Sequence, residues 1–131
     1  MLIYLIEDDK TNAELISLYL SKHGYMCVHY SCPLEFLNSI VDIPAPKILL
    51  LDIQMPKLDG FTLLNHLRTS HPAFLKQSYV IALTALAMQG DKQKCLDAGA
   101  DFYISKPFRM RHLLNHIEQI IKDTTKLNHG T

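Results

Sequence analysis

Chemically active side chains follow four separate apolar segments of this chain. They are Glu7 and Asp8 after residues 2–6, Asp52 after residues 47–51, Thr84 after residues 79–83, and Lys106 after residues 101–105. Two carboxylates about 5 Å apart repel by roughly 3 kcal/mol at an effective dielectric constant near 20, so three of them need cations. Lys106 offsets one charge, and magnesium suits the remainder because it binds carboxylate oxygens and keeps water ligands that phosphate oxygens can replace. These residue types predict a magnesium-dependent phosphoryl site.

Taken one at a time, these residues have ordinary structural explanations. Asp8 or Asp9 can cap a helix that follows, and an aspartate after an apolar run is often a turn residue. Thr84 can bond to the backbone at the end of a strand, and Lys106 can be solvated. The chemical interpretation therefore requires a fold in which all four segments end at the same edge.

Five short apolar segments predict β-strands, at residues 2–6, 25–30, 47–51, 79–83 and 101–105. The stretches between them have helical spacing, as in Leu113, Ile117 and Ile120. Strands that are apolar on both faces and alternate with helices imply a parallel sheet covered on both sides. The predicted fold is α/β, a doubly wound five-stranded parallel sheet of (βα)5 type with one helix after each strand. In such sheets, ligands bind outside the carboxyl ends of the strands, where the four groups stand.

Capping residues predict where the helices begin and end. Thr11 or Asn12 can cap the first helix, and Gly24 can end it. Ser31 followed by a proline predicts the start of the second helix, and Gly99 predicts the end of the fourth.

The composition describes one domain of balanced charge. The 131 residues include 13 Lys and Arg and 13 Asp and Glu, so direct nucleic-acid binding is not expected. No apolar run approaches the roughly 20 residues that cross a bilayer, and acidic residues follow the first segment too soon for a signal peptide. The chain is predicted to be cytoplasmic, without membrane contact. Cys27, Cys32 and Cys95 lack metal-site spacing and are predicted to be packed thiols.

Four motifs, LIEDD, LLLDIQMPKLDGF, ALTA and AGADFYISKPF, occur in the order and at the spacing of one family. On these motifs, residues 1–122 resemble the receiver domain of two-component response regulators, of the chemotaxis-type single-domain kind. The resemblance implies the flavodoxin-like receiver fold and a phosphorelay switch rather than a classical enzyme. Residues 123–131 are predicted to be a polar tail or the remnant of a linker, and it is left open whether the chain is a stand-alone receiver or part of a longer regulator or hybrid kinase.

The resemblance also implies a metal site and a phosphoacceptor. Asp52 matches the phosphoacceptor, which takes a phosphoryl group from a phosphohistidine on a sensor histidine kinase or a histidine phosphotransfer protein. Asp8 and Asp52 match direct Mg²⁺ ligands, Glu7 matches the acid that acts mainly through metal-bound water, and Gln54 offers its backbone carbonyl. Gln54 and Leu86, each two residues after a site residue, are expected to border the phosphoryl group.

Three further positions match the phosphoryl contacts and the switch of the family. Thr84 matches the hydroxyl and Lys106 the ammonium that contact the phosphoryl group, and the Lys106–Pro107 bond matches one that is cis. Tyr103 matches the aromatic residue that turns inward when the hydroxyl at Thr84 moves. Alternation along residues 101–105 places Phe102 and Tyr103 on opposite faces, with Phe102 predicted as the core ring and Tyr103 as the rim ring.

A polar and partly basic face follows from residues 89–99, 101–105 and 106–112. Lys106, Arg109, Arg111 and His112 near the start of the last helix give this face its polar, partly basic character. The resemblance favours docking of a downstream protein there, whereas a solvated face is the ordinary alternative. Dimerisation on phosphorylation is left open.

Other functions remain as alternatives. A pseudo-receiver would bind partners without phosphorylation, although the acidic, hydroxyl and lysine positions are all retained. A flavodoxin-like carrier would need a phosphate-binding first loop, whereas EDDKTN is anionic. An aspartyl-phosphate phosphatase would need a second acid where Gln54 stands, and His112 with His116 forms no H-E-x-x-H metal motif.

Overall fold

Five parallel strands form one sheet in the computed structural model, which describes residues 2–40, 48–55, 59–85 and 90–123. The elements in chain order are β1 (Leu2–Ile6), α1 (Lys10–Lys22), β2 (Met26–Tyr30), α2 (Pro33–Ser39), β3 (Ile48–Asp52), α3 (Gly60–Ser70), α4 (Pro72–Gln77), β4 (Tyr79–Thr84), α5 (Asp91–Ala98), β5 (Phe102–Ser105) and α6 (Met110–Lys122). The strand order is β2-β1-β3-β4-β5, and every neighbouring pair is parallel. The predicted doubly wound α/β fold is confirmed.

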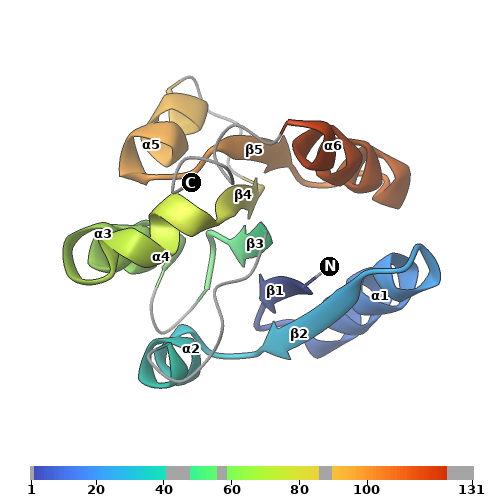
Figure 1. The fold of residues 1–131 in the computed structure, drawn as a ribbon, viewed down its shortest axis with the longest axis horizontal. Coiled ribbons are helices and arrows are strands. Elements are labelled where there is room, and N and C mark those ends of the chain that lie inside the picture. The colour runs from blue at the N-terminus through green and yellow to red at the C-terminus, as the bar shows by residue number, and fades with distance from the viewer. Residues whose placement is uncertain (1, 41–47, 56–58, 86–89, 124–131) are drawn as a thin grey trace.

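Helices α1 and α6 cover one face of the sheet, and helices α2, α3, α4 and α5 cover the opposite face (Figure 1). Along β3, the side chains of Ile48 and Leu50 pack toward α1 and α6, whereas those of Leu49 and Leu51 pack toward α2, α3, α4 and α5. Every residue of β3 and β4 is buried, which explains why these segments read as continuous apolar runs rather than as alternating ones.

Helix α4 is a correction to the expected pattern of one helix per strand. The sequence HPAFLKQ forms a short additional helix between α3 and β4 because Pro72 suits a first helical turn. Phe74 is buried there and packs edge-on against Phe36 of α2, with ring centroids 5.6 Å apart. The helices predicted as fourth and fifth are therefore α5 and α6.

The start of α1 decides among the capping residues that the sequence allowed. Asp9 is the N-cap, which confirms its interpretation as a capping residue, whereas Thr11 and Asn12 are not the cap. The Asp9 carboxylate accepts the backbone N–H of Asn12 over 3.1 Å. Pro33 begins α2 as predicted, but the capping residue is Cys32, not Ser31. Gly24 and Gly99 follow or end their helices with φ angles of +89° and +124°, which favour glycine.

The remaining boundaries shift by one residue. Asp52 is the last residue of β3 and not the first residue after it, β4 extends through Thr84, and β2 and β5 each begin one residue later than predicted. The predicted tail lies outside the described residues beyond Asp123. Among the described helices, none is both long and apolar enough to cross a membrane.

Candidate functional site

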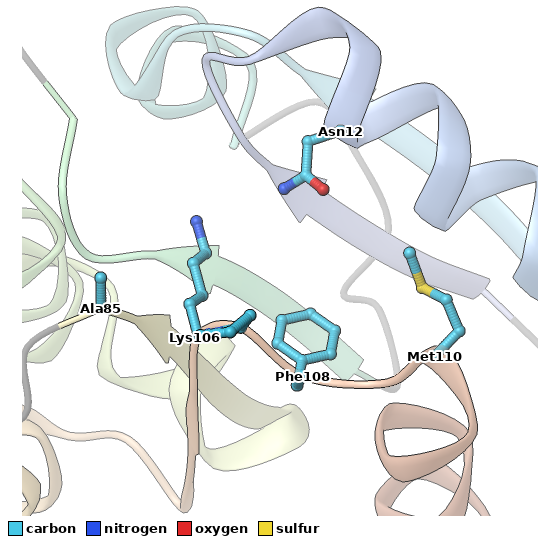
Figure 2. A pocket seen from close by; sticks show the side chains of 6 residues that line it. Asn12, Ala85, Lys106, Phe108 and Met110 are labelled. Atoms are coloured by element: carbon cyan, nitrogen blue, oxygen red, sulfur yellow. The ribbon is translucent and has the colours of Figure 1, made fainter.

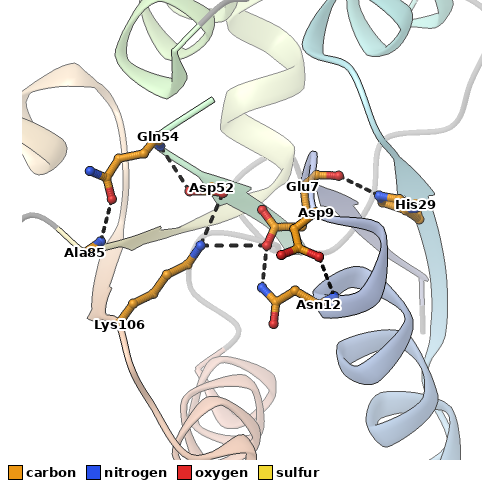
Figure 3. Close-up of polar contacts among 8 residues, drawn as sticks. All are labelled: Glu7, Asp9, Asn12, His29, Asp52, Gln54, Ala85 and Lys106. Carbon is orange, nitrogen blue, oxygen red and sulfur yellow. Dashed lines mark hydrogen bonds and ion pairs between the residues drawn. The ribbon is translucent and has the colours of Figure 1, made fainter. Parts of the chain in front are cut away.

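The strand order brings the predicted site residues to one edge of the sheet. The chain leaves β1 toward β2 on one side and leaves β3 toward β4 on the other, so the connections diverge between β1 and β3. Ligands of open α/β sheets bind at such a switch point. Glu7 follows β1 and Asp52 ends β3, and Figure 3 shows both carboxylates turned toward Lys106, which follows β5.

Asp52 is a buried carboxylate with two fixed partners. Only 4% of the residue is exposed. Its Oδ2 lies 3.2 Å from the Lys106 Nζ, and its Oδ1 accepts the backbone N–H of Gln54 over 3.0 Å. These contacts fix the orientation of the Asp52 carboxylate at the end of a buried strand.

Glu7 is more deeply buried than Asp52 and is surrounded by polar contacts. Its Oε1 lies 3.7 Å from the Lys106 Nζ and accepts the side-chain amide of Asn12. Its backbone carbonyl accepts the Nε2–H of His29 on β2 over 2.7 Å, which keeps the proton on that ring nitrogen. The residue is 1% exposed. Burial, followed by a hydrogen bond from the protonated carboxyl to Asp52, raises the pKa of Glu7 to about 8.

The acidic cluster fits a divalent cation. One carboxylate oxygen from each of Glu7, Asp8 and Asp52 lies within 4.8 Å of the others. As a carboxylate, Glu7 leaves its buried Oε2 without a hydrogen-bond donor among the described residues. A hard cation would satisfy this oxygen directly or through a bound water, and oxygen ligands of this kind suit magnesium. Asp8 is the exposed member of the acidic cluster, so an ion bound there would keep water ligands on its solvent side.

A pocket of about 340 Å³ opens beside this cluster (Figure 2). The residues that line it are Asn12, Ala85, Lys106, Pro107, Phe108 and Met110. The peptide bond between Lys106 and Pro107 is cis, in agreement with the expectation. The pocket offers space for a small anionic group next to the ammonium of Lys106.

Two side-chain contacts in the site were not found by sequence reasoning. Asn12 contacts Glu7 from the first turn of α1, and the side-chain Oε1 of Gln54 accepts the backbone N–H of Ala85 over 2.9 Å. The sequence did offer a signal for the Asn12 contact. Asn12 is a polar residue in the first turn of a helix, and that helix follows a strand that ends in acidic residues. For Gln54 the sequence offered only its position two residues after Asp52.

The predicted switch residues lie on neighbouring strands. Thr84 is fully buried at the end of β4, and its carbonyl accepts the backbone N–H of Lys106 over 2.7 Å. Tyr103 packs beside the buried cluster that contains Ala82, and strand alternation places Thr84 on that same face. Phe102 packs on the opposite face, but both rings are half-buried, so Phe102 is less enclosed than predicted. Leu86 lies outside the described residues.

A second pocket lies at the junction of β5 and α6. It measures about 500 Å³, has Pro107 and Phe108 among its lining residues, and carries three basic side chains, those of Arg109, Arg111 and His112. All three are exposed. The positive charge predicted near the start of the last helix is thus gathered beside the site.

Comparison with known proteins agrees with this geometry. Residues 3–118 match the response regulator receiver domain. The chain is 34% identical over 116 residues to hybrid signal transduction histidine kinase G of Dictyostelium discoideum, covering 85% of this chain and 3% of that kinase. It is 29% identical over 121 residues to the polar-differentiation response regulator DivK of Brucella ovis, covering 92% of this chain and 96% of DivK.

Solved structures show the same relationship. The receiver domain of the Francisella response regulator 1452 superposes with a TM-score of 0.84 at 28% identity, covering 94% of this chain and 98% of that one. The chain spans between 48% and 51% of the length of three transcriptional regulators that it also matches. Given the parallel fold, the acidic cluster at its switch point and these matches, the chain belongs to the response regulator receiver domain family.

Proposed function

We propose that Asp52 accepts a phosphoryl group from a phosphohistidine and that the chain works as the phosphoacceptor switch of a two-component phosphorelay. The observation that carries the proposal is the Asp52 carboxylate, which is 4% exposed and lies 3.2 Å from the Lys106 ammonium within an acidic cluster. A buried carboxylate of fixed orientation beside a cation suits an attack on phosphorus.

In the proposed reaction, a carboxylate oxygen of Asp52 attacks the phosphorus of the phosphohistidine. A new O–P bond forms while the N–P bond of the donor breaks, and the imidazole leaves. Lys106 offsets the negative charge of the phosphoryl oxygens, and the hydroxyl of Thr84 donates to one of them. Positioning and charge neutralisation account for most of the catalysis in such transfers.

Magnesium would be held by Glu7, Asp8, Asp52 and the backbone carbonyl of Gln54. When bound, it neutralises charge on the phosphoryl oxygens and relieves the repulsion among the three carboxylates. Two observations support this assignment: the Oε2 of ionised Glu7 has no hydrogen-bond donor among the described residues, and one oxygen from each of the three carboxylates lies within 4.8 Å of the others. Asp8 contributes the exposed ligand, so the metal can be exchanged without opening the core.

The proposed switch needs two kinds of partner, one that donates the phosphoryl group and one that responds to it. A sensor histidine kinase or a histidine phosphotransfer protein supplies the phosphoryl group in the cytoplasm, and a downstream protein reads its presence. We place the reading surface on α5, β5 and α6, where Arg109, Arg111 and His112 surround the second pocket and Tyr103 lies on β5. Phosphorylation shifts this surface only if the two states of Thr84 and Tyr103 make different contacts with the phosphoryl group.

Incubation with phosphoramidate and magnesium, followed by intact-mass analysis, tests the phosphoacceptor. We expect the wild type to gain the mass of one phosphoryl group and Asp52→Asn to gain none. Asp59→Asn is the matched control because Asp59 caps α3 through its side chain, and asparagine caps equally well. Failure of the wild type to gain mass would favour the pseudo-receiver alternative, and equal gain by Asp52→Asn would refute Asp52 as the phosphoacceptor.

A further inference from the structure

Gln54 joins the ends of two neighbouring strands across the site, through its backbone N–H and its side chain. Its backbone N–H donates to Asp52 Oδ1 over 3.0 Å, and its side-chain Oε1 accepts the backbone N–H of Ala85 over 2.9 Å. Gln54 follows β3 and Ala85 follows β4. Figure 3 shows both hydrogen bonds on the same side of Asp52 as Lys106. One residue therefore connects the carboxylate of Asp52 to the backbone at the end of β4.

Ala85 lines the pocket in which a phosphoryl group on Asp52 would lie. Ala85 and Lys106 line this pocket together (Figure 2). The Lys106 ammonium is 3.2 Å from the Asp52 Oδ2. A phosphoryl group carries three strong acceptor oxygens, and donors fixed around them stabilise the product and the transition state. One donor at the edge of this pocket is occupied by Gln54 in the structure.

We propose that Gln54 is a resting-state acceptor for the Ala85 N–H, and that phosphorylation of Asp52 exchanges its Oε1 for a phosphoryl oxygen. The inference rests on the proposed function of Asp52. No covalent bond changes in the exchange: Ala85 keeps its proton, one hydrogen bond breaks, another forms, and the Gln54 amide is released to water. Gln54 is thus a positioning residue that opposes phosphorylation and holds the end of β4 until Asp52 is modified.

The expected effect on hydrogen exchange and on phosphorylation is that of losing one neutral hydrogen bond. The net free energy that such a bond typically contributes corresponds to about a fivefold change in an equilibrium or a rate. Because Ala85 is exposed, its N–H meets water as soon as the Gln54 acceptor is removed. Removal of that acceptor should therefore leave Ala85 open to solvent and make Asp52 easier to phosphorylate.

Amide hydrogen exchange at Ala85, measured by NMR on the metal-free, unphosphorylated chain, tests the resting contact. Gln54→Met keeps the length of the side chain but removes the acceptor, and Gln54→Ala is a second variant in case methionine disturbs the loop. Gln93→Met is the matched control, since Gln93 is exposed on α5 and contacts only Asp97 among the hydrogen bonds described for it. We expect exchange at Ala85 to be about fivefold faster in both Gln54 variants and unchanged in Gln93→Met.

The rate of phosphorylation by phosphoramidate at fixed magnesium then tests the consequence. We expect Gln54→Met to be phosphorylated about fivefold faster than the wild type, with exchange at Ala85 slowed again once the phosphoryl group is present. Unchanged exchange at Ala85 in both Gln54 variants would overturn the resting contact. Faster exchange without faster phosphorylation would overturn the opposing role. A wild type that accepts no phosphoryl group would instead refute the function of Asp52, while the exchange data would still decide the contact.

Discussion

Replacing Glu7 by glutamine should stabilise the metal-free protein at neutral pH. Burial, together with a hydrogen bond to Asp52, raises the pKa of Glu7 from 4.5 to about 8. Between these values the folded state retains a proton that the unfolded chain releases. Because the folded state binds more protons, the free energy of unfolding falls as the pH rises from about 5 to about 8. Glutamine cannot ionise, so it removes this loss.

The structure sets the size of the gain. Neutral pH lies about 2.5 pH units above the unfolded value of 4.5, and each unit corresponds to about 1.4 kcal/mol. The expected gain in the free energy of unfolding is therefore about 1 kcal/mol at pH 5 and about 3 kcal/mol at pH 7. Glutamine mimics the protonated acid, since its oxygen can still accept from Asn12 and Lys106 while its amide donates to Asp52.

Urea unfolding in EDTA, followed by far-UV circular dichroism at several pH values from 5 to 8, measures this difference. The chain has no tryptophan, so circular dichroism is the better signal. Glu14→Gln, at an exposed position of α1, is the matched control and should change stability by less than about 0.5 kcal/mol. Added magnesium should stabilise the wild type more than Glu7→Gln, because binding to the folded state adds stability. A gain that does not grow between pH 5 and pH 7 would refute the reasoning.

Three further predictions concern stability. Asp9→Ala should cost about 1 kcal/mol in urea unfolding through loss of the α1 cap, and Asp9→Asn should cost far less. Gly60→Ala should cost about 1–3 kcal/mol, since its Cβ would lie 2.6 Å from Ile53 Cδ1 and 2.8 Å from Ile53 Cα; an unchanged unfolding midpoint would contradict this. Burial, followed by the nearby His112, lowers the pKa of His116, so the unfolded chain takes up a proton there more readily than the folded state. Acidification below neutrality should therefore destabilise the wild type more than His116→Gln, and thermal unfolding at pH 8 and pH 5 measures this difference.

The sequence was sufficient to predict the five strands and the chemically active residues at their carboxyl ends, whereas helix α4 was not predicted. The apolar runs of β3 and β4 are buried on both faces, so their composition alone revealed a parallel sheet covered by helices. Since the carboxyl ends of parallel strands share one edge, the positions of Glu7, Asp52 and Lys106 at the ends of three different strands were enough to predict that they meet. The local residue pattern and the parallel direction of the strands were therefore enough to predict where the site lies.

Only the tertiary structure decided which groups touch and how deeply each is buried. The contacts of Asn12 with Glu7 and of Gln54 with Ala85 depend on where a helix turn and a loop settle over the sheet, which no spacing in the sequence specifies. The raised pKa of Glu7 likewise depends on desolvation and on the nearness of Asp52, which local pattern does not fix. Periodicity describes one element at a time, whereas side-chain contacts and electrostatics arise from several elements packed together.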